Sequence, residues 1–336
     1  TIVDNCWFGN FHKKDKNLKI IKEDIRNFDK INIKGVYAII HLANIANDPS
    51  VELNPTLSWE VNVLASKLIA DHAIKNKVKK IIFFSSGSVY GVKKEKKVIE
   101  DLKLNPISVY NKTKMIAERV FLSYKNKIDI KCLRPATVCG LSERLRLDVT
   151  VNKLTFDGFY KKKIFVDGGS QVRPNVNLID IIRVVDHLLN SRVKLEKNIY
   201  NMGFENFSIL KIAKKIQEKT GAKLIINKSI DLRSYRQDSS RLIKTGFKPF
   251  CTKTDIVVGN PTGETMTSSP SSQPKYFFRA DIRTKLAELP EFTICTNFAP
   301  KTLPKARSNL FTFSPATTHL PSIKVLMAAI ISSSSQ

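Results

Sequence analysis

Three side chains of this 336-residue chain have the types and spacing that proton transfer requires: Ser86, Tyr110 and Lys114. Tyr110 and Lys114 stand at positions i and i+4 of a helical pattern, so they share one face, while Ser86 follows an apolar run that reads as a strand. A free tyrosine has a pKa of ~10 and needs a nearby cation to act as a base at neutral pH. We therefore expect Lys114 to stabilise a Tyr110 phenolate and Ser86 to orient a substrate hydroxyl.

A second Tyr-x-x-x-Lys, from Tyr90 to Lys94, has the same spacing in a different context. Gly91 follows Tyr90 directly at a strand end, and no helical periodicity continues from it. The segment around Tyr110, in contrast, has an apolar stripe at helical spacing: Ile107, Val109, Met115, Ile116 and Val120. Only the Tyr110 copy is therefore predicted to lie on a helix.

Apolar runs that alternate with helical patterns predict how these residues are positioned. We expect strands at residues 1–4, 18–21, 36–43, 79–86 and 128–135, and helices at 54–76 and from Tyr110 onward. Such alternation is typical of right-handed βαβ units in a doubly wound parallel α/β sheet. Ligands of these sheets bind outside the carboxyl ends of the strands, so Leu42 and Ala43 are expected to line a cleft. His41, inside an apolar run, is interpreted as a core residue.

Residues 1 to about 249 resemble an extended short-chain dehydrogenase/reductase of the NAD-dependent epimerase/dehydratase family, whose best-known members act on nucleotide sugars. The resemblance is carried by Val3-Asp4-Asn5, Glu23-Asp24-Ile25-Arg26, His41-Leu42-Ala43, Asn62, Ser85-Ser86-Gly87-Ser88-Val89-Tyr90-Gly91, Tyr110 with Lys114, and Arg134-Pro135-Ala136-Thr137-Val138. It implies a Rossmann-like fold with a smaller α/β substrate lobe. It also implies Ser86, Tyr110 and Lys114 as the catalytic residues.

The resemblance further implies NAD as the cofactor. The cofactor-binding positions are Asp4, Asp24, Ile25, Leu42, Ala43, Asn62, Ser85, Tyr110, Lys114, Pro135 and Val138. A carboxylate at Asp4 would accept hydrogen bonds from ribose hydroxyls and disfavour a 2′-phosphate, hence NAD rather than NADP. Asn62 matches the family asparagine near the nicotinamide ribose.

The substrate implied by the resemblance is a nucleotide sugar. Its expected contacts are Ser88, Arg144, Arg146, Asn152, Arg173 and Arg236. Arg173 corresponds to a family arginine that pairs with the substrate pyrophosphate, a task suited to the bidentate guanidinium fork. Arg236 is the arginine that we favour in the second nucleotide-contacting stretch, 231–238.

The reaction that we favour is that of a UDP-glucose 4-epimerase: Tyr110 removes the proton of the sugar 4-hydroxyl as hydride passes to the nicotinamide, and the hydride returns to the other face. A 4,6-dehydratase is an alternative, but its relatives carry Asp-Glu where this chain has Gly87-Ser88. A sugar 4-reductase uses the same triad. A catalytically silent, RNA-binding relative is the alternative from another class, suggested by the net charge of +26. Retention of the triad argues against it.

The bulk composition suits a soluble globular protein of two domains. The positive charge is mostly Lys scattered through the chain, which favours a solvated surface that helps to attract an anionic nucleotide rather than a nucleic-acid partner. Five cysteines without Cys-x-x-Cys spacing indicate reduced thiols, no metal site and a cytoplasmic location. No apolar run is long enough to span a bilayer. A homodimer through the helices that contain Asn62 and Tyr110 is typical of the family.

The two ends of the chain depart from the family. No Gly-x-x-Gly-x-x-Gly motif occurs in the sequence, so the first β-α unit is expected to precede Thr1, and the chain as it stands to bind NAD poorly. We expect an incomplete NAD-binding domain at residues 1–140 and a substrate lobe with returning Rossmann elements at 141–249. Residues 250–336 are rich in Pro, Ser and Thr, and are expected to be disordered or frameshifted.

Overall fold

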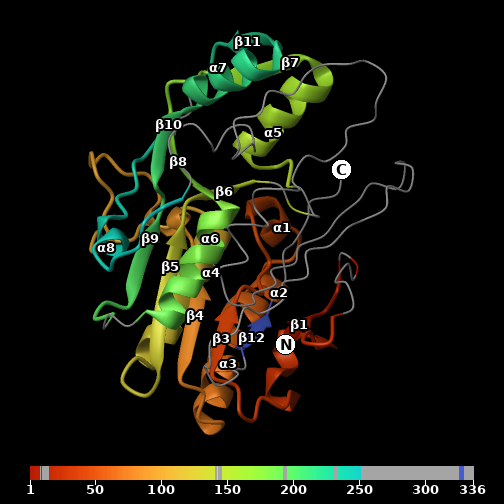
Figure 1. The fold of residues 1–336 in the computed structure, drawn as a ribbon, viewed down its shortest axis with the longest axis vertical. Helices are drawn as coiled ribbons and strands as arrows, with labels where there is room; N and C mark the ends of the chain where they lie inside the picture. Colours follow the sequence, from red (N-terminus) through yellow and green to blue (C-terminus); the bar gives the residue numbers. More distant parts are fainter. Residues whose placement is uncertain are drawn as a thin grey trace.

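The predicted apolar strands form one parallel sheet. The computed structural model describes residues 1–7, 9, 15–140, 142, 146–191, 195–229 and 234–250, together with a strand at 325–328. Within these residues the main sheet has seven strands in the order β2-β1-β12-β3-β4-β5-β9, every neighbouring pair being parallel (Figure 1). The strands are β1 (Ile2–Asp4), β2 (Ile20–Lys22), β3 (Ala38–His41), β4 (Lys80–Phe84), β5 (Asp129–Pro135), β9 (Ile199–Met202) and β12 (Val325–Ala328).

Helices cover both faces of this sheet, which is why its central strands are apolar on both sides. One face carries 3₁₀ helix η1 (Ile25–Lys30), α1 (Asp48–Leu53), α2 (Pro55–Trp59), π-helical turn η2 (Glu60–Leu64), α3 (Ala65–Lys75) and α4 (Val109–Ser123). The other face carries α6 (Leu178–Asn190) and α8 (Ser240–Ile243). The doubly wound fold class expected from the sequence is thereby confirmed.

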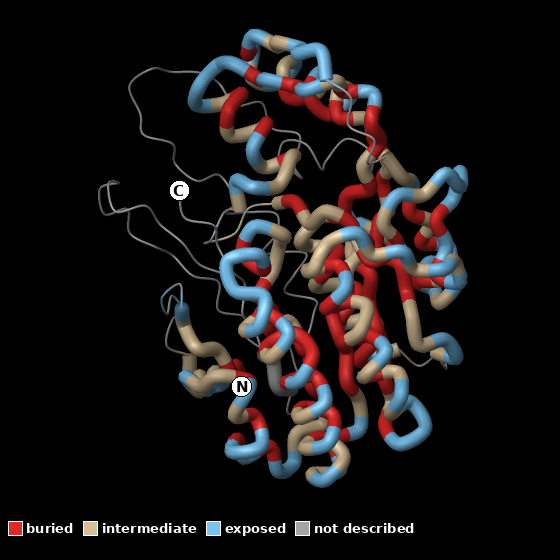
Figure 2. The backbone as a smooth tube through the Cα atoms, turned by 180° about the vertical axis from the view of Figure 1, so that it is seen from behind, coloured by how far each residue is buried: buried red, intermediate tan, exposed pale blue. Residues whose placement is uncertain are grey.

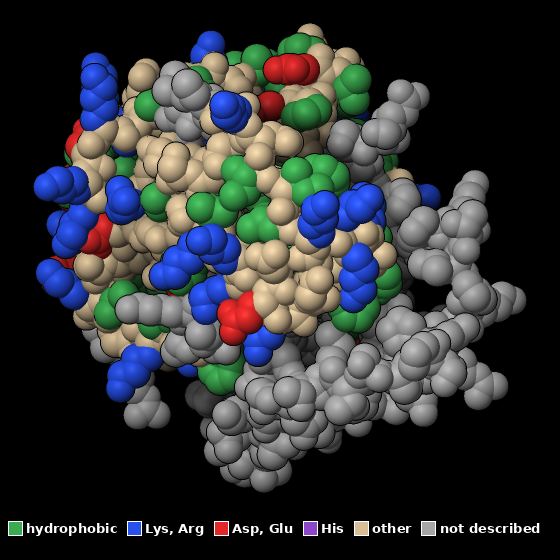
Figure 3. Space-filling view, turned by 90° about the horizontal axis from the view of Figure 1, so that it is seen from above, with side chains coloured by type: hydrophobic (Ala, Val, Ile, Leu, Met, Phe, Trp, Pro, Cys, Tyr) green, Lys and Arg blue, Asp and Glu red, His purple; other side chains and the backbone are tan. Residues whose placement is uncertain are grey.

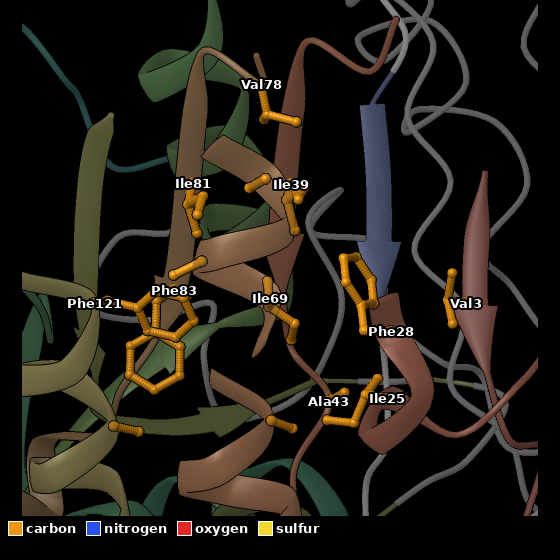
Figure 4. Close-up of a cluster of buried hydrophobic side chains, with 14 of the residues drawn as sticks. Val3, Ile25, Phe28, Ile39, Ala43, Ile69, Val78, Ile81, Phe83 and Phe121 are labelled. Carbon is orange, nitrogen blue, oxygen red and sulfur yellow. The ribbon is translucent and has the colours of Figure 1, made fainter. Parts of the chain in front are cut away.

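The core on the α3 and α4 face is continuous from the first strand to the fifth. Figure 4 shows Val3, Phe28 and Ile69 packed along one side of the sheet, and the Phe83 and Phe121 rings side by side with centroids 4.8 Å apart. Figure 2 shows the buried residues concentrated along the central strands. A sheet buried on both faces holds its strand ends in a fixed register, so side chains that follow neighbouring strands are positioned against one another.

The strand β12 comes from a segment in which we expected no ordered structure. It lies between β1 and β3, with Met327 opposite Ile2 and Ile40 in register, and is visible between those strands in Figure 4. The parallel pairing continues the hydrogen-bond ladder from the N-terminal pair β1 and β2 to the rest of the sheet. Apart from residue 250 and β12, the 250–336 segment lies outside the described part of the chain, so our expectation for it applies there as a prediction only.

A smaller lobe stands at the carboxyl edge of the main sheet (Figure 1). It contains α5 (Thr150–Phe156), π-helical turn η4 (Asp157–Lys161), β7 (Lys163–Asp167), α7 (Ile209–Thr220) and β11 (Lys223–Asn227), with β7 and β11 paired in parallel. Its core is a separate cluster that includes Leu154, Ile164 and Ile212. A sheet of β6 (Thr137–Cys139), β8 (Val172–Asn177) and β10 (Glu205–Ser208) connects it to the body. The domain boundaries that we expected remain a prediction.

Basic side chains are spread over the face of the molecule that carries the small lobe. Seen from above the small lobe, Lys and Arg side chains lie around much of the face, with few Asp and Glu among them (Figure 3). This distribution is compatible with the solvated surface that we expected, which remains a prediction. None of the helices that the structure describes is long and apolar enough to cross a bilayer.

Candidate active site

The serine-rich turn after β4 begins the candidate site. β4 ends at Phe84, and Ser86 caps the 3₁₀ helix η3 (Gly87–Tyr90) by accepting a hydrogen bond from the backbone N–H of Ser88 at 3.2 Å. The Ser86 and Ser88 hydroxyls are 2.8 Å apart. The short turn therefore holds two hydroxyl groups at the carboxyl end of a central strand.

Helix α4 brings the phenol to this turn. Ser108 caps the helix, accepting from Asn111 N–H at 3.2 Å, so that Tyr110 lies in the first turn. The Ser86 hydroxyl lies beside the Tyr110 phenol, close enough to act on its pKa. Burial raises the pKa of Tyr110, while the Ser86 bond and the nearby Arg146 guanidinium oppose that rise. The serine and the tyrosine predicted to act together are in contact.

Lys114 reaches the same strand end by another route. Its side chain is buried, and Nζ donates to the carbonyl oxygen of Phe84 at 2.7 Å and lies 4.9 Å from the centroid of the Phe83 ring. Burial lowers the pKa of Lys114 to about 7. We expected its charge to stabilise a phenolate, but in this state the pKa of Tyr110 is raised and the Lys114 amine is bonded to the backbone of β4.

The candidate adenosine residues follow the next strands at the same edge. Asp4 ends β1, and its Oδ1 accepts from Cys6 N–H at 2.7 Å. Asp24 follows β2, caps η1 and forms an ion pair with Arg26 at 2.9 Å. Ile25, the first residue of η1, is buried. Beyond β3, Leu42 is partly exposed and Ala43 is buried.

Asn62 lies within the π-helical turn η2 and is almost fully buried. Its Oδ1 accepts from Ile45 N–H at 2.8 Å, and its Nδ2 donates to the Ile45 carbonyl and to Thr113 Oγ1, both at 3.1 Å. These bonds use the whole amide to hold the loop after β3 against α4. The side chain that we assigned to a ribose thus supports the wall of the site.

Three further cofactor candidates lie around the serine turn. Ser85 Oγ is buried and has no hydrogen-bond partner among the described residues. Pro135 ends β5, with its carbonyl oxygen 3.0 Å from where a Cβ on Gly87 would be, and Val138 lies partly exposed on β6. The unpartnered Ser85 hydroxyl, together with the acidic residues after β1 and β2, fits a dinucleotide at its two ends.

Of the predicted substrate residues between 144 and 152, one lies near the phenol and another bonds to the surrounding loop. Arg146 lies near the Tyr110 phenol and pairs with Asp148 at 2.5 Å. Asn152, in contrast, donates to the Arg146 carbonyl at 3.0 Å and accepts from Gly140 N–H at 3.1 Å, so it shapes the loop. Arg144 lies outside the described residues.

The 234–238 segment reaches the turn through a residue that we did not single out. Arg236 is exposed, whereas the Tyr235 hydroxyl lies 3.4 Å from where a Cβ on Gly87 would be. Burial raises the pKa of Tyr235 to about 12, and Arg173 on β8 opposes the rise. Neighbouring residues of an extended segment point to opposite sides, so Tyr235 lies toward the turn while Arg236 is exposed, and the substrate role of Arg236 remains a prediction.

A doubly wound sheet with a serine, a tyrosine and a helical lysine at its carboxyl edge defines the short-chain dehydrogenase/reductase class. The more particular assignment follows from comparison with known sequences. The chain belongs to the NAD dependent epimerase/dehydratase family, whose model matches residues 5–203. The resemblance stated from the motifs is thereby confirmed.

Sequence relatives point to the same kind of protein. The chain is 27% identical to the UDP-glucose 4-epimerase of Lactobacillus helveticus over 242 residues, covering 64% of this chain and 73% of that protein. It is 30% identical to the UDP-glucose 4-epimerase of Mycolicibacterium smegmatis over 185 residues, covering 52% and 58%. The chain is also 30% identical to a relative from Methanocaldococcus jannaschii over 190 residues, which cover 54% of this chain and 62% of that protein.

Solved structures agree in fold. The UDP-glucuronic acid 4-epimerase of Bacillus cereus, in complex with NAD, is 26% identical with a TM-score of 0.64, covering 73% of this chain and 78% of its own. The UDP-glucose 4-epimerase of Thermotoga maritima superposes with a TM-score of 0.67 at 22% identity, covering 76% and 87%. The latter likeness concerns the fold alone.

Proposed function

We propose that this chain performs the proton transfers of an NAD-dependent nucleotide-sugar 4-epimerase. The observation that carries the proposal is the proximity of Ser86 to the Tyr110 phenol at the end of β4, with Lys114 one helical turn further on and bonded to the same strand end. Tyr110 takes the proton from the sugar 4-hydroxyl and later returns it, while Ser86 holds the oxygen. NAD, when bound, supplies the acceptor and donor of hydride.

Lys114 would change its role when the cofactor binds. In the structure its amine is bonded to Phe84, and burial lowers its pKa to about 7, which favours the neutral form compared with a lysine in water. Ribose hydroxyls placed beside the amine would supply the hydrogen-bond acceptors that favour the ammonium form. A charged Lys114 would then lower the pKa of Tyr110 and prepare the phenol to act as a base. We propose that cofactor binding and activation of Tyr110 are coupled in this way.

The residues that would hold NAD lie at two places. Asp4 and Asp24 would bind the adenosine end, and Ser85, Lys114, Pro135 and Val138 would surround the nicotinamide end. The pyrophosphate between them is usually bound by a glycine-rich turn, and this sequence has no Gly-x-x-Gly-x-x-Gly. Weak NAD binding is therefore expected.

The packing around Gly87 supports epimerisation over 4,6-dehydration. A Cβ at this position would lie 3.0 Å from the Pro135 carbonyl and 3.4 Å from both Gln237 Nε2 and Tyr235 Oη. An acidic side chain in this slot, which the dehydratase reaction would need, would require the Pro135 carbonyl to shift by a few tenths of an ångström. A 4-reductase uses the same triad and is distinguished only by its product.

The function is tested by incubating the protein with UDP-glucose or UDP-glucuronic acid and NAD, and analysing the products by chromatography. We expect the 4-epimer of one substrate to form, and Tyr110→Phe to abolish it. The matched control Tyr160→Phe changes an exposed tyrosine and should leave the rate unchanged. NADH binding, measured by fluorescence, separates failure to bind from failure of the chemistry. A 4-keto-6-deoxy product, or unchanged turnover in Tyr110→Phe, would contradict the proposal.

A homodimer is proposed as the assembled form. Trp59 and Leu64 on the Asn62 helix and Ile107 just before α4 are exposed apolar side chains on the elements that we expect at the interface. Covering them with a second copy would remove apolar surface from water. Light scattering should give twice the chain mass, and Leu64→Glu should return the protein to a monomer.

A further inference from the structure

A buried polar cluster lies directly behind the candidate catalytic residues. Its centre is Arg134 on β5, the strand next to β4, with 2% of its surface exposed. Arg134 Nε and Nη2 donate to the Glu118 carboxylate at 3.0 and 2.5 Å. Arg134 Nη1 donates to Tyr90 Oη at 2.8 Å and to the Glu100 carbonyl at 3.0 Å. The guanidinium therefore hydrogen bonds to two side chains, Glu118 and Tyr90, that lie on different sides of it.

These two side chains belong to the two halves of the site. Tyr90 is the last residue of η3, the turn that Ser86 caps. Glu118 lies on α4, four residues after Lys114 and eight after Tyr110, so the three share one face of the helix. One guanidinium thus connects the turn that carries the serine to the helix that carries the phenol.

We propose that Arg134 is a positioning residue that sets the separation between the Ser86 hydroxyl and the Tyr110 phenol. The inference deepens the proposed function, because it assigns a task to residues that do not touch the substrate. The sequence motifs did not reveal it: Tyr90 belongs to a rejected Tyr-x-x-x-Lys and to the resemblance, and Arg134 to the resemblance, neither with a task of its own.

Each member of the cluster makes more than one contact, and such multiple contacts make the connection rigid. Tyr90 Oη also donates to Asn201 Oδ1 at 2.8 Å, and its ring lies 4.9 Å from the Arg134 guanidinium carbon. Gln237 Nε2 donates to the Arg134 carbonyl at 2.7 Å and to Asn201 Oδ1 at 2.9 Å. Tyr90, Glu118 and Asn201 are at most 1% exposed, so water does not compete for these bonds.

Small movements of either half would matter because a hydrogen bond weakens steeply with distance and angle. A displacement of about 1 Å at a reacting group can cost about 100-fold in rate. The charged groups that face Tyr110 are Arg146, from the loop before α5, and Asp48 of α1, whereas the Lys114 amine on its own helix is bonded to the Phe84 carbonyl. None of these belongs to the Arg134 cluster, so loosening the cluster should act on the phenol through the Ser86 bond.

The variant Tyr90→Phe tests the connection by removing one hydroxyl. We expect kcat to fall about tenfold with KM within about twofold, and the phenol of Tyr110 to titrate at higher pH than in the wild type. That titration is measured by ultraviolet difference absorbance against Tyr110→Phe, and needs neither substrate nor cofactor. Tyr200→Phe, which removes another buried tyrosine hydroxyl from β9, is the matched control and should leave both readouts unchanged.

A double-mutant cycle identifies the route of the effect. In a Ser86→Ala background, Tyr90→Phe should cause no further loss of kcat and no further change in the titration, because the bond through which it acts is gone. A tenfold loss that persists without Ser86 would overturn the proposal. So would a Tyr90→Phe variant whose phenol titration and kcat both match the wild type.

A substitute variant and a readout that does not depend on turnover allow the positioning role to be tested in every case. If Tyr90→Phe does not fold, Glu118→Asp keeps the charge of the cluster while shortening the arm to α4, and the same two readouts apply. If the wild type shows no epimerisation, the proposed function fails, but the titrations of Tyr110 in the wild type and variants still accept or reject the positioning role.

Discussion

Burial of an ionisable lysine makes the stability of this protein depend on pH in a defined direction. Lys114 is 4% exposed, and its pKa is lowered from 10.5 to about 7 by burial. Between these values the unfolded chain binds more protons at this residue than the native protein, so the free energy of unfolding rises with pH. The penalty is complete below pH ~7 and disappears as the pH approaches ~10.5.

The size of the effect follows from the same two values. At about 1.4 kcal/mol for each pH unit, the full penalty is about 5 kcal/mol, and raising the pH from 7 to 9 should recover about 2 kcal/mol of it. Lys114→Met should remove this slope. It should also raise the stability at pH 7 by about 2 kcal/mol, after about 1–3 kcal/mol is lost because the Phe84 carbonyl no longer has its partner. The substitution would at the same time abolish turnover.

Urea denaturation at several pH values measures both quantities. Lys112→Met, on the exposed side of the same helix, is the matched control and should keep the wild-type slope. The difference in slope between wild type and Lys114→Met isolates this lysine from other titrating groups. Equal slopes in these two proteins would refute the reasoning, because they would mean that Lys114 is not forced toward its neutral form by the fold.

Two further predictions are tested by measuring stability. Gly91 has φ +67°, and a Cβ there would collide with the Asn105 carbonyl oxygen, so Gly91→Ala should lower the free energy of unfolding by more than about 3 kcal/mol. Gly35 has φ +76° but nothing within 4 Å of such a Cβ, so Gly35→Ala should cost only about 1 kcal/mol. Denaturant titrations measure both values. Glu118→Gln should cost about 3–5 kcal/mol in the same assay, because it leaves the buried Arg134 charge without a counterion; a loss below about 1 kcal/mol would contradict that expectation.

The periodic parts of the chain were predictable from the sequence. Apolar runs predicted strands that became β3, β4 and β5, and the stripe around Tyr110 predicted α4. These predictions succeed because the spacing of apolar residues along a strand or helix is a local property, set by which of its side chains are buried. The meeting of Ser86 with Tyr110 was also predictable, since a strand end and the first turn of a helix fix where both side chains point.

The partners of polar side chains were not predictable in this way. Asn62 and Asn152 bond to loops, and Lys114 bonds to the Phe84 carbonyl, which the sequence did not indicate; their predicted ligand roles remain predictions. A polar residue satisfies its hydrogen bonds with whatever group the packing brings near, and that group is often far away in the sequence. The approach of Tyr235 to the serine turn was not predictable for the same reason, and the role of Arg236 remains a prediction.

The sequence by itself determined the central strands β3, β4 and β5, the helix that carries Tyr110, and which residue types stand at the strand ends. Only the tertiary structure decided that Val325–Ala328 pairs between β1 and β3, and that Arg134 grips Tyr90 and Glu118 together. Local periodicity is carried by neighbouring residues, whereas a sheet order and a buried ion pair depend on contacts between segments that meet only when the chain has folded.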